Sequence, residues 1–407
     1  MLRTFKQDFE TIFMEHYSDL ILTKDEHRRI LAGHLWIFSN EIDTERSPLK
    51  AFTAGQIVRV ISAQGRSLGF AHVNPNNLIC ARLLTRDVGI TPDALLAARL
   101  AEALALREQW YSKPYYRLVY GESDGLPGLV VDRFGSVLVV QLNTAGMDTK
   151  RGVIIDALRR SINPDTIVLR NDSPARIQEG LVAAVEIVHG ALDTPCKVYE
   201  HGAEFTVDVL EGQKTGWFYD QYDNRGRIQP LVKGARVLDL FSYTGAWGIQ
   251  AAVAGAAEVY CVDESPRALA GVTANAALNS VSERVFAVQK DGFDFVKQNH
   301  DPFDLVVLDP PALIKKRKDV PKGVQAYLSL NVHALKHVKP GGLLVTCSCS
   351  YHLQRETFRT LLVQAARKAH VRIQCLVEGG QAPDHPVLPA MLETDYLKVS
   401  FLRVLGH

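Results

Sequence analysis

Two short segments carry side chains whose types and spacing suit chemistry on a flat ring. The segment TCSCS places two thiols, Cys347 and Cys349, directly after the apolar run Gly342–Thr346. The segment DPP places Asp309 after the run Asp304–Leu308, and its two prolines stiffen the backbone and remove N–H donors. An ionised thiol is a nucleophile, and a rigid carboxylate can hold the ring-nitrogen and amine edge of a nucleobase.

This pair of groups suits methylation of a pyrimidine at carbon 5, which is a poor nucleophile. A thiolate that adds at carbon 6 makes the ring an enamine, carbon 5 then attacks the methyl group, a base removes the carbon-5 proton and the thiol leaves. Cys349, farther out from the strand, is the predicted nucleophile, and Asp309 would hold the base and assist its protonation. Cys347 is expected to be core or a support. The remaining cysteines are expected to be buried structural thiols: Cys80, Cys196, Cys261 and Cys375.

The elements that position these groups begin at Val237–Asn279. A buried strand ends near Phe241, Gly245 and Gly248 permit a sharp turn, and Asp263 closes a second strand about 20 residues later, as in dinucleotide-type folds. The stretch predicts half of a Rossmann-like, nucleoside-binding crevice.

Alternating strands and helices continue to the C-terminus, so we expect an α/β domain with a parallel sheet covered on both faces. Val285–Gln289 is a third strand with Asp291 just beyond it, and the last two strands, Val371–Val377 and Tyr396–Val404, predict an antiparallel edge. Helices are expected at Arg267–Leu278, Val324–Lys336 and Glu356–Lys368. Sites in such sheets lie at the carboxyl ends of the strands.

The ligand of this crevice is predicted from its charge. Asp239, Asp263 and Asp291 would repel a phosphate, and the chain has neither a complete GxGxxG motif nor a Walker lysine, which disfavours NAD and ATP. S-adenosylmethionine fits better, because its ribose diol, adenine amine and cationic groups complement acids and backbone carbonyls.

The N-terminal half reads as two smaller domains. Short strands from Leu20 to Leu84 predict a β-rich domain over 20–92, and residues 93–196 predict a connecting helix and a central α+β domain. Glu122 and Asp124 lie in a polar turn, where turn-forming acids are the favoured explanation. Residues 1–19 form an N-terminal extension, and residues 197–407 are assigned to a hairpin plus the α/β domain.

Three polar stretches are candidates for RNA contact. Basic residues stand among aromatics at Lys24–Phe38, the segment EGQKTGWFYDQYDNR precedes the α/β domain, and a basic run, Lys315–Lys318, follows DPP at the mouth of the predicted site. A solvated turn, a capped helix start and a solvated loop are the respective alternatives.

Composition limits the class of protein. The 407 residues have a net charge of +1, so any basic surface is local, and 47% hydrophobic residues fit a globular chain of two or three domains. The first twenty residues lack a signal-peptide core, and no apolar run approaches the roughly 20 residues of a membrane span. The six cysteines lack a framework spacing, so we expect a reducing cytoplasm and no zinc site.

The chain resembles the RlmI-type 23S ribosomal RNA cytosine-5 methyltransferases of the large subunit from about Leu20 to the C-terminus. The segments that carry the resemblance include GHLWIFSNEI, YRLVYGESDGLPGLVVDRFG, GQKTGWFYDQYDNR, LDLFSYTGAWG, LDPPAL, TCSCS, DHPV and YLKVSFLRV. The resemblance implies an N-terminal PUA domain that guides RNA, a small central α+β domain and a class I S-adenosylmethionine domain.

Site residues follow from the motifs and this resemblance together. The predicted catalytic residues are Cys349 and Asp309. The predicted cofactor-binding residues are Asp239, Phe241, Ser242, Tyr243, Thr244, Gly245, Asp263, Glu264, Asp291, Gly292 and Asp309. The predicted contacts with ribosomal RNA are Lys24, Arg28, Arg29, Lys214, Gln221, Arg225, Pro310, Lys315, Lys316 and Arg317.

The sequence departs from the family at two positions of the site. Ala312 stands where the family commonly has a lysine after the two prolines, and the position of Cys347 is usually not cysteine. Related enzymes with a similar GQKTG segment methylate guanine, so methylation of a guanine nitrogen or an exocyclic amine is an alternative function. A non-catalytic PUA-containing RNA-binding factor is another. The sequence leaves open whether the chain forms a homodimer.

Overall fold

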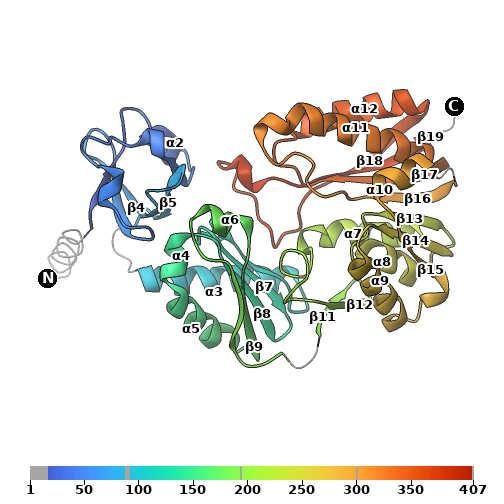
Figure 1. Ribbon diagram of the computed structural model, residues 1–407, viewed down its shortest axis with the longest axis horizontal. Coiled ribbons are helices and arrows are strands. Elements are labelled where there is room, and N and C mark those ends of the chain that lie inside the picture. The colour runs from blue at the N-terminus through green and yellow to red at the C-terminus, as the bar shows by residue number, and fades with distance from the viewer. Residues whose placement is uncertain (1–16, 88–91, 193–194, 299–300, 406–407) are drawn as a thin grey trace. The chain divides into compact units, whose positions relative to one another are not determined.

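The computed structural model describes residues 17–87, 92–192, 195–298 and 301–405, and the predicted arm at Met1–Asp19 lies almost wholly outside them. The described residues form two compact units, and the chain contributes to each of them more than once (Figure 1). One unit draws on Met1–Thr194, Asp208–Trp217 and Asp384–Thr394, and the other on Pro195–Val207, Phe218–Pro383 and Asp395–His407.

The first unit begins with a five-stranded sheet in the order β1-β3-β4-β5-β2, which confirms the β-rich N-terminal region. Alternate apolar side chains of these strands, such as Leu20, Val58 and Val60, close a core of their own. A short helix, α2 (His27–Leu31), was missed because its basic residues read as a turn. The strands are β1 (Asp19–Ile21), β2 (Trp36–Phe38), β3 (Ile57–Ile61), β4 (Ser67–Val73) and β5 (Ile79–Thr85).

Helix α3 (Pro92–Trp110) leads into a second five-stranded sheet, in the order β10-β9-β8-β7-β6. The neighbours are antiparallel except β8 and β9, which α5 (Arg151–Ile162) joins as a parallel pair. The sequence analysis did not predict the edge strand β10 or the short helices α4 and α6. The other elements are β6 (Tyr115–Tyr120), β7 (Leu129–Phe134), β8 (Val137–Leu142), α4 (Ala145–Thr149), β9 (Thr166–Asn171), α6 (Pro174–Gln178) and β10 (Ala184–His189).

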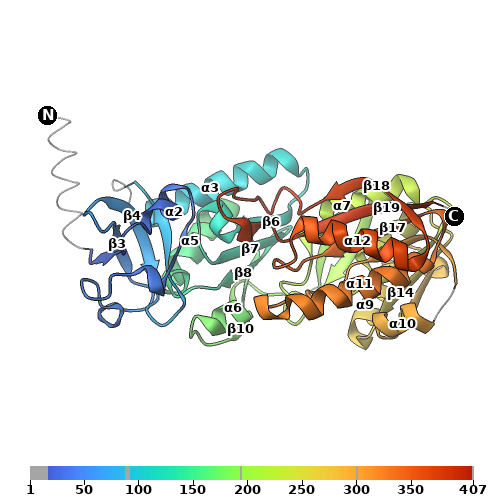
Figure 2. The same ribbon diagram turned by 90° about the horizontal axis from the view of Figure 1, so that it is seen from above.

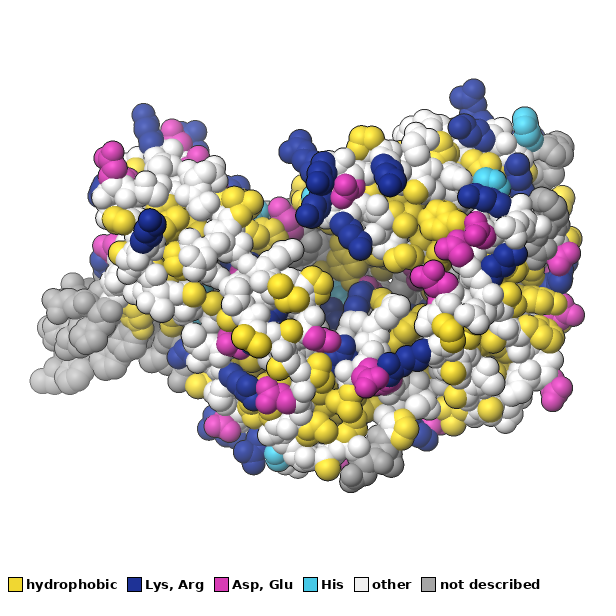
Figure 3. Space-filling view, in the orientation of Figure 1, with side chains coloured by type: hydrophobic (Ala, Val, Ile, Leu, Met, Phe, Trp, Pro, Cys, Tyr) yellow, Lys and Arg dark blue, Asp and Glu magenta, His cyan; other side chains and the backbone are white. Residues whose placement is uncertain are grey.

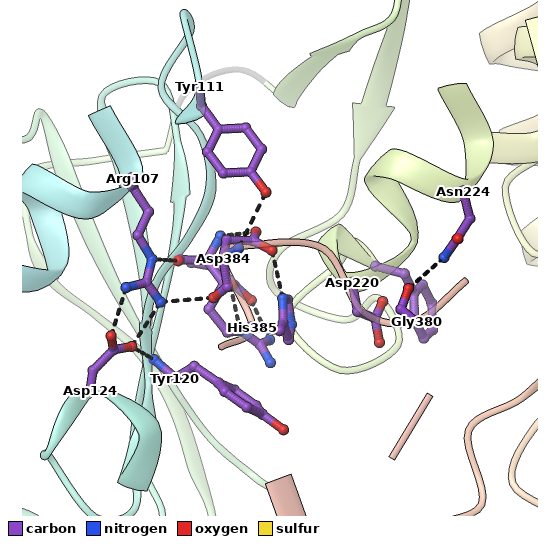
Figure 4. A network of polar contacts seen from close by, with 12 residues as sticks. Arg107, Tyr111, Tyr120, Asp124, Asp220, Asn224, Gly380, Asp384 and His385 are labelled. Atoms are coloured by element: carbon purple, nitrogen blue, oxygen red, sulfur yellow. Dashed lines mark hydrogen bonds and ion pairs between the residues drawn. The ribbon is translucent and has the colours of Figure 1, made fainter. Parts of the chain in front are cut away.

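A buried polar network fastens the segment Asp384–Thr394 into the first unit (Figure 4). The fully buried Arg107 guanidinium donates to both oxygens of Asp124, at 2.6 and 2.8 Å, and to the carbonyl of Asp384 at 2.8 Å. The Asp384 carboxylate accepts from the Arg117 N–H at 2.8 Å, and its other oxygen lies 2.7 Å from Nδ1 of His385. Asp124 is therefore a structural acid, and a segment that the sequence assigned to the last domain packs with the central one.

The second unit starts with a hairpin, β11 (Cys196–Glu200) and β12 (Ala203–Val207), and helix α7 (Tyr222–Ile228). An ion pair between Arg225 and Glu200, each side chain 1% exposed, ties the hairpin to α7. Gln250 adds a bond from its Nε2 to Glu200 at 2.6 Å. Because an unpaired charge is costly in such a place, this pair fixes the segment that leads into the main sheet.

The main sheet has seven strands in the order β15-β14-β13-β16-β17-β19-β18. The first five are parallel, and β19 runs antiparallel to both β17 and β18, so the predicted parallel sheet with an antiparallel end is confirmed. The strands are β13 (Arg236–Leu240), β14 (Glu258–Asp263), β15 (Val285–Gln289), β16 (Phe303–Leu308), β17 (Val338–Ser348), β18 (Arg372–Gly379) and β19 (Lys398–Leu405).

Helices cover both faces of this sheet (Figures 1 and 2). The apolar sides of α10, α11 and α12 pack with Leu238, Val306 and Leu344 in one buried cluster. Helices α8 and α9 pack on β13, β14 and β15. The helices are α8 (Ala246–Val253), α9 (Pro266–Leu278), α10 (Gly292–Gln298), α11 (Val320–Lys336) and α12 (Arg355–Ala369), of which α10 was not predicted.

The prediction that all four remaining cysteines are buried is wrong for one of them. Cys80, Cys196 and Cys261 are buried, whereas Cys375 is exposed. Cys375 lies on β18, the outermost strand of the sheet, which has only β19 as a neighbour. The apolar run around Cys375 correctly predicted strand β18, but it did not predict that this strand lies at the edge of the sheet.

The Arg225–Glu200 pair gives a test of what stabilises the second unit. Arg225→Met should lower the free energy of unfolding by about 3–5 kcal/mol, because it leaves a buried carboxylate without its cation. The double variant Arg225→Met/Glu200→Met should lose much less, since no lone charge is left behind. Urea unfolding followed by circular dichroism measures the difference. Arg359→Met, which removes one partner of an exposed pair with Glu378, is the control and should change little. Equal losses in the single and double variants would contradict this account.

Candidate active site

The strand order reverses between β13 and β16, since β14 follows on one side of β13 and β16 lies on the other. In α/β sheets, ligands bind outside the carboxyl ends of the strands at such a point. Asp239 lies near the end of β13, and Asp309 directly follows β16 with its N–H 3.5 Å from the carbonyl of Leu240. The predicted acids are thus brought to one edge of the sheet.

The turn after β13 has an unusual backbone. Phe241 and Tyr243 have φ values of 62° and 50°, and Gly245 has 82°. The left-handed region disfavours residues with side chains, and it recurs where backbone is held for a ligand. Gly245 opens α8, so this turn leads directly into the N-terminus of a helix.

Asp263, at the end of β14, is oriented by the same turn. Its Oδ2 accepts a bond from the Tyr243 N–H and its Oδ1 from the Ser265 N–H, both at 2.9 Å. A carboxylate oxygen accepts more than one hydrogen bond, so each oxygen retains capacity for a ligand hydroxyl. This arrangement suits the pair of hydroxyls on a ribose.

Several polar atoms of the turn are buried and have no hydrogen-bond partner among the described residues. They are Oδ1 of Asp239, Oγ of Ser242 and Oγ1 of Thr244. Burial, and then the charges of Asp309 and Asp263, raise the pKa of Asp239 to about 8, although the Gly248 N–H donates to its Oδ2 at 2.9 Å. Buried polar atoms without partners are costly, so they fit a ligand with donors and positive charge.

The end of β15 closes the other side of the turn. A Cβ atom added to Gly292 would lie 2.6 Å from the Phe241 ring, so that ring rests directly on the glycine backbone. Asp291 uses its Oδ1 to accept the Asp294 N–H at 3.0 Å and thereby caps α10. Glu264 is exposed next to Asp263. All the predicted cofactor residues therefore lie at the ends of β13, β14, β15 and β16.

Three side chains surround the Asp309 carboxylate. Gln221 Nε2 and Trp247 Nε1 donate to its Oδ2 at 2.9 and 3.1 Å, and the Cys347 thiol lies in hydrogen-bond contact with both Asp309 and Gln221. Asn224 donates to Gln221 Oε1 at 2.9 Å and so fixes the amide of Gln221. The carboxylate is held in a defined orientation.

Two buried serines, Ser348 at the end of β17 and Ser350 just beyond it, fix the backbone around Cys349. Ser350 Oγ accepts from the Ile314 N–H at 3.1 Å and lies 3.0 Å from the hydroxyl of Tyr327. Between the serines, Cys349 is half-buried, and its Sγ lies 4.0 Å from the carbonyl oxygen of Pro310. The thiol is thus presented beside the DPP segment.

The two thiols of TCSCS differ in environment. Cys347 is fully buried, and burial, followed by the nearby Asp309 charge, raises its pKa well above the ordinary value. A thiol that resists ionisation is a poor nucleophile. Cys349 is the more accessible of the two, as expected for the reactive group.

The predicted RNA contacts differ in exposure. Lys24, Arg28, Lys214, Lys315, Lys316 and Arg317 are exposed. Figure 3 shows Lys and Arg side chains gathered over the segment where α11 begins, which follows this last run. Pro310 and Gln221 are buried at the site. These placements leave the RNA contacts as predictions.

Two of the predicted RNA contacts have other partners. Arg29 binds both carboxylate oxygens of Glu41, at 2.5 and 2.7 Å, and Arg225 is enclosed with Glu200. Trp36, one of the aromatics beside the basic cluster, donates its indole N–H to Glu122 at 2.8 Å. The contacts of these side chains fit a supporting role in the fold.

The sequence reasoning missed Trp247, Tyr327 and Lys398. Each lies in a motif or a helix that the sequence marked, but its partner lies far along the chain, 62 residues away for Trp247 and Asp309. Nothing in the sequence next to these three residues indicates that their side chains lie at the site. Among the described residues no cluster of three or more His, Cys, Asp or Glu side chains could hold a metal ion. No described helix has the length and apolarity needed to cross a membrane.

This fold and this site define an S-adenosylmethionine-dependent methyltransferase. The family model of that description matches residues 178–391, and a PUA-like domain model matches residues 20–86. S-adenosylmethionine is therefore the cofactor, and the acids and partnerless polar atoms around Phe241–Gly245 fit it.

The relatives narrow the family. A Ribosomal RNA large subunit methyltransferase I from Shewanella frigidimarina is 36% identical over 94% of this chain and 98% of its own length. A protein of the same name from Erwinia tasmaniensis is 35% identical over 95% of this chain and 99% of its own. The chain belongs to the family of the Ribosomal RNA large subunit methyltransferase I proteins.

Two solved structures share the fold over 95% of this chain. One, described as a proposed SAM-dependent methyltransferase from Streptococcus mutans, has a TM-score of 0.81 over 95% of this chain and all of its own, at 20% identity. Another, described as a proposed methyltransferase complexed with SAH, has a TM-score of 0.82 at 20% identity, with the same coverage.

The pKa of Asp239 predicts how stability varies with pH. Its pKa is 3.8 in the unfolded chain and about 8 in the folded protein, so unfolding releases a proton between these values. This group therefore stabilises the fold below pH 4, and the contribution disappears as the pH rises to 8. Between pH 5 and 8 the cofactor-free protein should lose up to roughly 4 kcal/mol that Asp239→Asn does not lose.

Urea unfolding at pH 5, 6.5 and 8, with wild type and Asp239→Asn measured side by side, checks this expectation. The Asn variant keeps the acceptor for the Gly248 N–H, so it is also the matched control for the local geometry. Parallel pH curves for the two proteins would show that Asp239 is ionised in the folded chain.

Proposed function

We propose that this protein methylates carbon 5 of a cytosine in large-subunit ribosomal RNA through a covalent adduct with Cys349. One observation carries the proposal: a half-buried thiol, set between two anchored serines, lies 4.0 Å from the Pro310 carbonyl in the segment that bears Asp309. Methylation of a ring or exocyclic nitrogen needs no thiol at that place.

The residues would act in a fixed order. Cys349 Sγ forms a bond to carbon 6 as a proton adds to the base, which leaves carbon 5 nucleophilic. Bound S-adenosylmethionine would supply the electrophilic methyl group that carbon 5 takes, with S-adenosylhomocysteine as the leaving group. A base then removes the carbon-5 proton, the electron pair expels the thiolate, and the ring releases the proton that it had gained, so Cys349 and a neutral base are regenerated.

Asp309 is the group proposed to hold the cytosine. Gln221 and Trp247 fix one of its oxygens, and a carboxylate held in this way can face the ring-nitrogen and amine edge of the base. Ala312 supplies no cation after the two prolines, so recognition of the base rests on Asp309 and its neighbours.

Ribosomal RNA is proposed as the substrate from three features together. Relatives at 35–36% identity are named for methylation of large-subunit ribosomal RNA, and a PUA-like model matches residues 20–86. The exposed run Lys315–Arg317 lies directly after the segment that would hold the base. Cations beside a nucleobase site can contact the backbone phosphates.

Cys349→Ala should lower methyl transfer by at least roughly 10³-fold while S-adenosylmethionine still binds, because it removes the group that activates carbon 5. Transfer is measured with the protein and ribosomal RNA from cells that lack it, followed by mass spectrometry of the nucleosides. Calorimetric titration measures donor binding. Cys375→Ser, which alters an exposed thiol on the edge strand, is the control and should keep full activity.

The same assay separates the alternatives. Full transfer by Cys349→Ala would end the covalent mechanism, and a methylated guanosine in place of 5-methylcytidine would assign the chemistry to a nitrogen. Absence of donor binding in the wild type would leave a role in RNA binding alone.

Replacement of Lys315, Lys316 and Arg317 by Gln should weaken RNA binding and flatten its dependence on salt. Each phosphate contact that is lost should reduce the slope of log K against log salt by roughly 0.7–0.9. Filter binding at several potassium chloride concentrations measures both quantities. Arg367→Gln/Lys368→Gln, on the exposed side of α12, is the control. An unchanged slope would place the RNA backbone elsewhere.

A further inference from the structure

Lys398 is a buried lysine at the first position of β19, where it is 4% exposed. Its register partner across the antiparallel pair is Ser348, one residue before Cys349. Its Nζ donates to the carbonyls of Ser350 and Tyr396, both at 2.7 Å. The ammonium group therefore lies against the segment that presents the proposed nucleophile.

This ammonium group has no ion-pair partner within 4.0 Å among the described residues, although an unpaired buried charge is expensive. Burial lowers the pKa of Lys398 to about 8, with the nearby Asp395 and the Cys349 thiol opposing that shift and Arg355 adding to it. Lysine is almost never buried in this way without a pair. The position calls for an explanation other than general stability.

Other titratable groups face the same thiol. Burial, and then the nearby Cys349, raise the pKa of Tyr327, on α11, to about 12. The pKa of Cys347 is raised by burial and also by the nearby Asp309 and Cys349. These groups are neutral at pH 7 or negative. Lys398 is the described cation whose ammonium bonds the backbone of the Cys349 segment itself.

We propose that Lys398 is a positioning residue that holds the Ser348–Ser350 segment and keeps a positive charge beside Cys349, so that the thiolate forms readily. This inference rests on the proposed role of Cys349 as the nucleophile. A neighbouring cation favours the ionised form of a thiol, and the effect is strong where water is excluded. A purely structural lysine would tie the two carbonyls without affecting the thiol.

The reactivity of Cys349 with iodoacetamide across pH 5.5–9.5 distinguishes these two roles. The full-length protein is alkylated without RNA or donor, and the modified cysteine peptides are counted by mass spectrometry. In the wild type the midpoint for Cys349 should lie below the roughly 8.5 of an ordinary thiol. Lys398→Met should raise the midpoint by about one unit, which slows alkylation at pH 7 about tenfold.

Two further variants separate charge from tethering. Lys398→Gln keeps a donor for the Ser350 carbonyl but has no charge, and it should raise the midpoint as Lys398→Met does. Lys398→Arg keeps the charge and should restore most of the reactivity. Cys375, on the outer strand beside Arg359 and Glu378, is the control within the same chain, and its profile should be equal in all variants.

An unchanged Cys349 profile in Lys398→Gln, or a wild-type midpoint at or above that of an ordinary thiol, would overturn the proposal. The wild-type midpoint needs no variant, so the test survives a failure of Lys398→Met to fold. Because alkylation is read without substrate, its outcome is independent of methyl transfer. Retained transfer by Cys349→Ala would refute the covalent mechanism whatever Lys398 does to the thiol.

Discussion

The reversal of strand order between β13 and β16 is the constraint on which the site depends. The strands β14 and β16 lie on opposite sides of β13, and such a reversal leaves a crevice at the carboxyl ends of the strands. Asp239 and Asp309 both lie at that crevice. The left-handed residues Phe241 and Tyr243 can exist there because the turn is held on both sides, by Asp263 and by Gly292. Strain in the turn and partnerless buried atoms are thus two consequences of one arrangement that suits a nucleoside ligand.

The strand order also brings together the proposed reacting groups. Parallel pairing of β16 with β17 sets the DPP and TCSCS segments side by side, and Ser350 joins them through the Ile314 N–H. The antiparallel β19, inserted between β17 and β18, then brings Lys398 to the same segment. A sheet with its last strands in simple order would not place a lysine there. The mixed end of the sheet therefore shapes the proposed catalytic corner as well as closing the fold.

The network around Arg107 holds a segment from late in the chain within the first unit. The loop between β18 and β19 supplies Asp384 and His385 to the central domain. There the Arg107 guanidinium donates to the carbonyl of Asp384, and the backbone N–H of Arg117 donates to its carboxylate. Likewise Arg170 donates to the carbonyls of Val209 and Gly212. Removing such bonds would leave buried charges behind, which makes these segments hard to detach.

The sequence by itself determined the strands of the main sheet and the glycine turn, because apolar runs and turn residues act locally. It also predicted acids at the strand ends and Cys349 as the nucleophile, because parallel sheets collect their sites at one edge. Only the tertiary structure decided which groups meet. Gln221 reaches Asp309 across 88 residues and Lys398 reaches Ser350 across 48. The tertiary structure also decided that Cys375 is exposed, that Arg29 pairs with Glu41, that Arg225 is buried with Glu200, and that Asp384–Thr394 packs with the central domain. Pairings over such separations are set by strand order and register, which local composition does not encode.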